Sequence, residues 1–180
     1  KLSWRTSSAS PRVMSTGDDP LRPYVVMEEI AGESLATIVA RGPQPPSDVA
    51  RIGAALADAV HSIHRQHVIH FDLKPENFIV RPDGQAVLID FGMAHHARLP
   101  DLLAEQRRSA AGSAPYVSPE QVGGIRSDLR SDIFALGVIL YEMATGERLW
   151  LDPAPPRQLV SDLPHWLQQI ICGCLEPAAA

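Results

Sequence analysis

The chain has 180 residues, with 16 lysines and arginines against 21 aspartates and glutamates, so its formal net charge is −5. One sizeable domain fits this length, and a hydrophobic content of 45% is enough to bury a core. The acidic balance argues against nucleic acid as the main partner, because such proteins need a basic face to displace counterions. No apolar run approaches the roughly 20 residues that span a bilayer, so no membrane partner is expected within this segment.

The two cysteines, Cys172 and Cys174, lie one residue apart in a helical pattern that points their side chains in different directions. A disulfide framework is therefore not expected, and the pattern favours a reducing, cytoplasmic location. The chain begins at Lys1 rather than at methionine and ends in a short alanine run after a helical pattern. Both features favour a piece of a longer protein.

Residues 1–23 show little periodicity, so no element is predicted there. A strand is predicted at Tyr24–Glu28, and a short helix from Glu33 to Ala40 is ended by Gly42 and Pro43. The most regular helical pattern of the first half then runs through Val49, Ile52, Leu56, Val60 and Ile63.

This first long helix is expected to start at Ser47, a good N-cap, with Asp48 in the first turn, where the helix dipole favours a negative charge. Extended residues at Val68–Ile69 follow it. A hairpin is predicted from Phe78–Val80 and Ala86–Ile89, joined by a proline-aspartate-glycine turn.

Residues 93–130 have weak periodicity and predict a long functional loop, in which His95–His96 are expected to be solvated. A second strong helix is predicted from Asp132 to Gly146, and a last one runs through Leu163–Leu175. The pattern predicts a mostly helical body with short hairpins rather than an alternating βαβ sheet.

The most polar cluster of the chain precedes the hairpin, and Asp90-Phe91-Gly92 follows it. A hairpin brings Asn77 and Asp90 together as oxygen ligands of the kind that Mg²⁺ prefers. Asp72 beside Lys74 can orient a hydroxyl against a phosphoryl group whose charge the lysine and the metal offset.

These motifs resemble the protein kinase family, in its serine/threonine branch and its bacterial form. Asp72 and Asn77 match the catalytic loop H-R-D-x-x-x-x-N, and Asp90-Phe91-Gly92 matches D-F-G in full. Ser118-Pro119-Glu120 matches A-P-E with serine for alanine. Lys74-Pro75-Glu76 looks like the serine/threonine form of the loop, and the resemblance covers the chain from about Val13 onward.

The resemblance implies an α+β, protein-kinase-like fold: a mostly α-helical C-lobe with only the last strands of the N-lobe present. Residues 1–23 would be a remnant of the N-lobe and connector, and residues 24–177 the kinase domain, truncated at both ends. The Gly-rich loop and the lysine strand of the family do not occur in this sequence. The missing N-lobe is therefore an expected partner, besides a protein substrate.

By the same resemblance, the protein is a serine/threonine kinase that uses ATP and Mg²⁺. Asp72 would be the catalytic base, and Lys74 would stabilise the transferred phosphoryl group. Asn77 and Asp90 would hold Mg²⁺ against the nucleotide phosphates. The other expected nucleotide-binding residues are Met27 as gatekeeper, the backbone of Glu28 and Ile30 at the hinge, and Ile79 at the pocket floor.

Supporting roles are implied for residues outside the reacting centre. Ser113 would place its hydroxyl between the peptide-binding segment and the catalytic aspartate, and Asp132 would hold the catalytic-loop backbone from beneath. Glu120 would anchor the end of the activation loop, although its arginine partner in the family does not occur in this sequence. His70 is expected to pack against the ring of Phe91.

Phe71 stands where the family has an arginine that pairs with a phosphorylated activation loop. The sequence therefore predicts activity without such a phosphate. Ser109 remains as a loop hydroxyl, and Arg107 and Arg108 are poor substitute partners because they lie on the same loop.

Two other functions remain open: a pseudokinase that acts as a docking module, and a small-molecule phosphotransferase of the aminoglycoside type. The complete set Asp72, Lys74, Asn77 and Asp90 argues against the first, and the segment around Ser113 argues against the second. If the small lobe is absent, Tyr24–Met27 with Ile79 and Val80 should form an exposed apolar patch.

Overall fold

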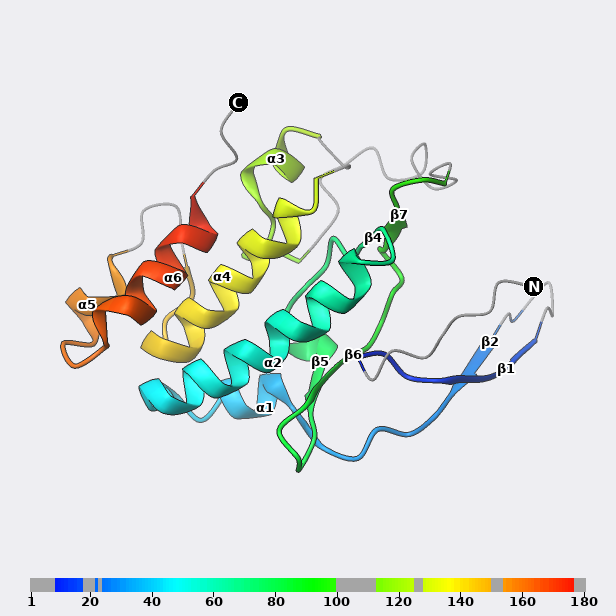
Figure 1. Ribbon diagram of the computed structural model, residues 1–180, viewed down its shortest axis with the longest axis horizontal. Coiled ribbons are helices and arrows are strands. Elements are labelled where there is room, and N and C mark those ends of the chain that lie inside the picture. The colour runs from blue at the N-terminus through cyan, green and yellow to red at the C-terminus, as the bar shows by residue number, and fades with distance from the viewer. Residues whose placement is uncertain are drawn as a thin grey trace.

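The computed structural model describes residues 9–17, 22, 24–99, 113–124, 128–149 and 154–176. Within these residues, the body consists of helices α2 (Pro46–His64), α4 (Arg130–Thr145) and α6 (His165–Leu175). Figure 1 shows α4 lying between α2 and α6, with the strands beyond α2. None of the helices among the described residues has the length and apolar character needed to cross a membrane.

Helix α2 buries the face that its sequence predicts, formed by Val49, Ile52, Leu56, Val60 and Ile63. It begins at Pro46, which suits the first helical position because proline has no N–H that would need a partner there. The residue before the helix is Pro45, so the prediction that Ser47 is the N-cap is wrong. Asp48 does lie in the first turn, as predicted.

Helix α4 is buried on most of its surface and forms the centre of the core. It begins at Arg130, slightly before the predicted start, and ends as predicted at Gly146, whose φ of 72° is left-handed. Gly137 allows α6 to approach closely, since a Cβ atom there would lie 2.7 Å from Cβ of Cys174. Cys172 and Cys174 carry free thiols, as expected.

Residues 70–77, which the sequence predicts to be catalytic, are called the catalytic segment below. The strands near them form small antiparallel sheets. β5 (Phe78–Val80) and β6 (Ala86–Leu88) make the predicted hairpin, and β3 (Glu33–Ser34) pairs with the other edge of β5. β4 (Val68–Ile69) pairs with β7 (His95–His96). The prediction that these histidines are solvated is wrong, because the pairing with β4 leaves both only partly exposed.

A separate antiparallel sheet consists of β1 (Val13–Gly17) and β2 (Tyr24–Met27), and Figure 1 shows it projecting from the helical body. The predicted strand at Tyr24 is thereby confirmed, whereas β1 corrects the expectation that residues 1–23 hold no element. Residues 13–17 show no strong alternation of apolar and polar side chains, and only their pairing with β2 defines them as a strand. Gly17 lies against the ring of Tyr24, where any Cβ atom would clash.

Both faces of this β1–β2 hairpin carry exposed apolar side chains. They are Val13, Met14, Tyr24, Val25, Val26 and Met27, with exposed fractions between 44% and 57%. The predicted patch is therefore confirmed at Tyr24–Met27. It does not extend to Val80, which is buried because β5 lies between β3 and β6.

Short helices complete the described part of the chain. They are α1 (Leu35–Val39), the 3₁₀ helix η1 (Pro75–Asn77), α3 (Pro119–Val122) and α5 (Pro156–Leu159). Helix α1 is shorter than predicted because Ser34 caps it, with the side-chain oxygen accepting a hydrogen bond from the Ala36 amide at 3.3 Å. The architecture is α+β, a mostly helical body with short hairpins, as predicted.

Candidate active site

The catalytic segment follows β4 and is held from beneath by one carboxylate. Asp132, buried at the start of α4, accepts the backbone N–H groups of His70 and Phe71, each at 2.9 Å. Its Oδ2 also lies 2.8 Å from Nε2 of His64. The predicted supporting role of Asp132 thus matches the contacts it makes, and these contacts hold the backbone just before Asp72.

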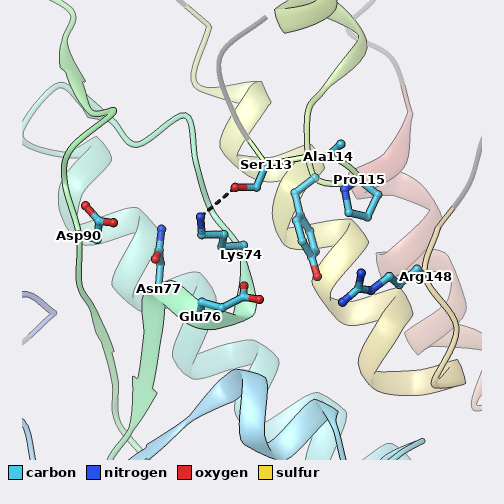
Figure 2. Close-up of a pocket in the computed structure, with 9 residues that line it drawn as sticks. Lys74, Glu76, Asn77, Asp90, Ser113, Ala114, Pro115 and Arg148 are labelled. Atoms are coloured by element: carbon cyan, nitrogen blue, oxygen red, sulfur yellow. Dashed lines mark hydrogen bonds between the residues drawn. The ribbon is translucent and has the colours of Figure 1, made fainter.

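Asp72, Lys74 and Ser113 form a closed set of contacts, although Ser113 lies far from the other two along the chain. The ammonium group of Lys74 is 3.0 Å from Oδ2 of Asp72 and donates to Oγ of Ser113 at 2.8 Å (Figure 2). The backbone N–H of Ser113 donates to Oδ1 of Asp72 at 2.8 Å. Each carboxylate oxygen of Asp72 therefore has one donor, which fixes the orientation of this side chain.

Asn77 and Asp90 line the same cavity as Lys74, as the hairpin of β5 and β6 predicts. Asn77 is buried and donates from Nδ2 to the backbone oxygen of Asp72 at 2.8 Å. Asp90 is exposed, and its Oδ1 accepts the N–H of Gly92 at 3.1 Å. The cavity has a volume of about 410 Å³ and is lined by Lys74, Glu76, Asn77, Asp90, Ser113, Ala114, Pro115, Tyr116 and Arg148.

The donor set at this cavity suits Mg²⁺. Because Nδ2 of Asn77 is engaged with the backbone, its amide oxygen is the atom left for a cation, and the carboxylate of Asp90 supplies charge. Mg²⁺ is held in proteins by one or two such oxygen groups together with water and substrate phosphates. Among the described residues, no group of three or more histidine, cysteine or acidic side chains could form a dedicated metal cage.

His70 packs against Phe91, as predicted, with ring centroids 5.3 Å apart and ring planes inclined by 57°. The imidazole is fully buried, and both of its ring nitrogens lack a hydrogen-bond partner. Burial lowers the pKa of His70, although the nearby charges of Asp132, Asp72 and Asp90 oppose this shift. The ring is therefore a neutral packing group between the catalytic segment and the Asp-Phe-Gly turn.

A second cavity of about 270 Å³ shares Glu76, Tyr116 and Arg148 with the first. The hydroxyl of Tyr116 donates to Oε2 of Glu142 at 2.6 Å, and Nε of Arg148 lies 3.4 Å from Oε1. Burial and the bond to Glu142 raise the pKa of Tyr116. Glu142 and Arg148 were not predicted from the sequence, although a carboxylate within the apolar pattern of α4 was a usable signal for Glu142.

The predicted adenine-pocket residues are not gathered at these cavities. Met27, Glu28, Ile30 and Ile79 line neither of the two cavities described above. Glu28 instead exchanges hydrogen bonds with Arg12, its N–H donating to the backbone oxygen at 2.9 Å and its Oε1 accepting the N–H at 3.0 Å. Their role in nucleotide binding stays a prediction.

Glu120, at the start of α3, accepts a hydrogen bond from the hydroxyl of Ser131 at 3.0 Å. A neutral hydroxyl on α4 therefore contacts this carboxylate, for which the sequence offers no arginine partner of the kind found in the family. The loop residues Arg107, Arg108 and Ser109 lie outside the described residues.

Comparison with known proteins agrees with the motifs. The sequence-family model of the protein kinase domain matches residues 12–172. A probable serine/threonine-protein kinase of Corynebacterium efficiens is 37% identical over 158 residues, covering 78% of this chain and 24% of that protein. Serine/threonine-protein kinase PknB of Mycobacterium leprae is 38% identical over 141 residues, covering 78% of this chain and 22% of that protein.

Serine/threonine-protein kinase PknL of Mycobacterium tuberculosis is 36% identical over 135 residues, covering 74% of this chain and 33% of that protein. The chain thus spans between 22% and 33% of the length of these relatives. Lys74 and Asn77 of the catalytic-loop motif and Asp90 of Asp-Phe-Gly line one cavity. The family model covers most of the chain. The chain belongs to the protein kinase family, and these relatives place it among its bacterial serine/threonine members.

Proposed function

We propose that this protein transfers the γ-phosphoryl group of ATP to serine or threonine hydroxyls of protein substrates. The observation that carries the proposal is the closed set formed by Asp72, Lys74 and Ser113 beside Asn77 and Asp90. Phosphoryl transfer depends mostly on positioning and on compensation of charge, and this set supplies both.

In the proposed reaction, a substrate hydroxyl donates its hydrogen bond to the carboxylate of Asp72. The hydroxyl oxygen attacks the γ-phosphorus, the bond to the β-phosphate oxygen breaks, and ADP leaves with that electron pair. Asp72 takes the hydroxyl proton as the new bond forms. Lys74 lies within reach of both Asp72 and Ser113, so its charge stabilises the phosphoryl oxygens beside the attacked hydroxyl.

Asn77 and Asp90 are the residues that we propose to hold Mg²⁺. When bound, the ion offsets negative charge on the nucleotide phosphates. Asn77 also positions the catalytic loop, because its amide bonds to the backbone oxygen of Asp72.

We also propose that residues 24–177 form the hinge and the helical C-lobe of the kinase domain, and that residues 1–23 belong to the N-lobe and connector. The exposed apolar side chains on both faces of the β1–β2 hairpin support a further structural partner, the remainder of the N-lobe. A cytoplasmic location stays a prediction from the cysteine pattern.

The test uses the native full-length polypeptide with labelled ATP, offering a basic protein and, separately, an aminoglycoside. We expect label on serine or threonine of the protein and none on the aminoglycoside. Asp72→Asn should abolish transfer, whereas Asp58→Asn, at an exposed carboxylate of α2, should leave it unchanged. Label on the aminoglycoside would favour a small-molecule phosphotransferase, and ATP binding without transfer would favour a pseudokinase.

A further inference from the structure

A buried carboxamide joins helix α3 to the catalytic segment. The side chain of Gln121 is 6% exposed, and its Nε2 donates to the backbone oxygen of Phe71 at 3.0 Å. At its other end, Oε1 accepts the N–H of Ser118 at 3.1 Å and lies 3.2 Å from the hydroxyl of the same serine. Both ends of the carboxamide are therefore used, and they link segments far apart in the sequence.

The oxygen that Gln121 binds belongs to the peptide group between Phe71 and Asp72. Phe71 has a φ of 63°, a left-handed conformation that costs a non-glycine residue about 1–2 kcal/mol. The N–H of Phe71 is held by Asp132, so hydrogen bonds fix this backbone from both sides. The Gln121 contact acts on the peptide group that leads directly into Asp72, so without it the backbone position of Asp72 is less constrained.

The side chain of Phe71 cannot link the catalytic segment to α3 by a hydrogen bond or an ion pair, because the ring has no charge and no hydrogen-bond donor. The contact to Gln121 uses the backbone of Phe71 instead, and a neutral group on α3 provides the donor. Residues 113–122, called the α3 segment here, also include Ser113, whose N–H donates to Asp72. The α3 segment thus contacts the catalytic loop at two points, the backbone oxygen of Phe71 and the carboxylate of Asp72.

We propose that Gln121 is a positioning residue for Asp72, acting through the backbone oxygen of Phe71 as an uncharged clamp between the α3 segment and the catalytic loop. The inference rests on the proposed function, since it assigns the clamp to phosphoryl transfer. It adds a residue that the kinase motifs in this sequence do not include.

Gln121→Glu is the sharpest variant, because it changes one NH₂ group into oxygen at nearly constant size. An ionised carboxylate cannot donate to Phe71, whereas a protonated one can. Among the described residues, the titratable or charged groups of the surrounding network are Glu120 on α3, Asp132 on α4, His64 on α2 and Asp72 on the catalytic loop. Most are acidic, so an added carboxylate there should be protonated more readily than one in water.

The matched control is Gln66→Glu. Gln66 also donates from Nε2 to a backbone oxygen, that of Ser62 at 3.2 Å, and it is partly buried at the end of α2. This control removes the same kind of hydrogen bond and adds the same charge without touching the peptide group before Asp72.

The experiment measures kcat and the KM for ATP of the full-length protein from about pH 5.5 to 8.5, as ratios to the wild type. For Gln121→Glu we expect kcat to fall about tenfold or more at the alkaline end, equivalent to ~1.4 kcal/mol in the barrier, with KM unchanged. The ratio should recover toward one as the pH falls and the new carboxyl group takes up its proton. Gln66→Glu should show neither the loss nor the recovery.

A kcat of Gln121→Glu that equals the control, or a loss that does not recover at low pH, would overturn the inference. Asp72→Asn separates this failure from that of the proposed function. If Asp72→Asn abolishes transfer and Gln121→Glu does not reduce it, only the clamp is wrong. If Asp72→Asn retains transfer, the proposed function is wrong, and the inference falls with it.

Discussion

Oδ2 of Asp132 lies 2.8 Å from Nε2 of His64, so the start of α4 is joined to the last turn of α2 directly beneath the catalytic segment. The same carboxylate accepts two buried backbone N–H groups. A single side chain therefore ties together helices α2 and α4 and the loop that carries Asp72, the proposed catalytic base.

Replacing this carboxylate should destabilise the whole fold. We expect Asp132→Ala to lower the free energy of unfolding by about 3 kcal/mol or more, because two buried N–H groups lose their acceptor. Asp128→Ala is the control, since Asp128 accepts the Arg130 N–H at an exposed site near the same helix end. Chemical denaturation measures both variants, and equal losses would contradict the buried role of Asp132.

Asp90→Ala should remove Mg²⁺-dependent transfer and leave the fold intact. A lost metal ligand should lower the rate roughly 1,000-fold, or about 4 kcal/mol in the barrier. Asp83→Ala is matched to it, because Asp83 also accepts the N–H two residues ahead, at 2.9 Å, but lies in the hairpin turn away from the cavity. Near-wild-type turnover of Asp90→Ala at ordinary Mg²⁺ concentrations would refute the assignment.

The buried imidazole of His70 should make stability depend on pH. Because burial lowers the pKa of His70 in the folded state, the unfolded chain binds the proton more readily below about pH 6.5. The neutral, buried His70 ring therefore contributes fully to folding stability above about pH 6.5. This stability is lost as the pH falls toward the lowered pKa of His70 in the folded state. Urea denaturation should show a weaker acid loss for His70→Leu than for the wild type, whereas His61→Leu, at an exposed position of α2, should retain the loss.

The β1–β2 hairpin should bind a hydrophobic dye in the 180-residue chain. Val25→Thr combined with Val26→Thr keeps the β-branched shape and removes apolar surface on both faces, so dye fluorescence and self-association should fall together. Val122→Thr, at a lone apolar side chain that is 69% exposed on α3, should change neither signal. A monodisperse chain without dye binding would contradict the exposed patch.

The full-length protein should need no activation-loop phosphate, because Phe71 offers no charge to bind one. Phosphatase treatment and Ser109→Ala should each leave the transfer rate within tenfold of the untreated protein. Ser113 is left unchanged in this test, since its hydroxyl contacts Lys74 directly. A tenfold or larger loss on removal of loop phosphate, ~1.4 kcal/mol in the barrier, would refute the prediction.

Much of the helical body follows from local pattern. The apolar spacing of Val49, Ile52 and Leu56 predicts the buried face of α2, and Gly146 ends α4 as its position predicts. These features depend on neighbours within a few turns, so the chain carries their signal locally. The same holds for the β5–β6 hairpin, whose short turn brings its strands together.

Two other strands had no such local signal. β1 and β7 are strands because β2 and β4 lie beside them, and nothing in their own residues predicts it. β7 pairs with a strand far from it in the sequence. The N-cap of α2 also differed by two residues, Pro45 instead of Ser47, because proline geometry outweighed the capping preference of Ser47.

At the site, the sequence alone determined which groups are present, from the spacing of Asp72, Asn77 and Asp90. Only the tertiary structure decided how they are held. The contacts of Ser113 with Lys74 and Asp72, and of Gln121 with the Phe71 oxygen, join residues separated by 39 to 50 positions. Hydrogen bonds act over about 3 Å, and the folding of the chain alone brings such distant donors and acceptors within that range.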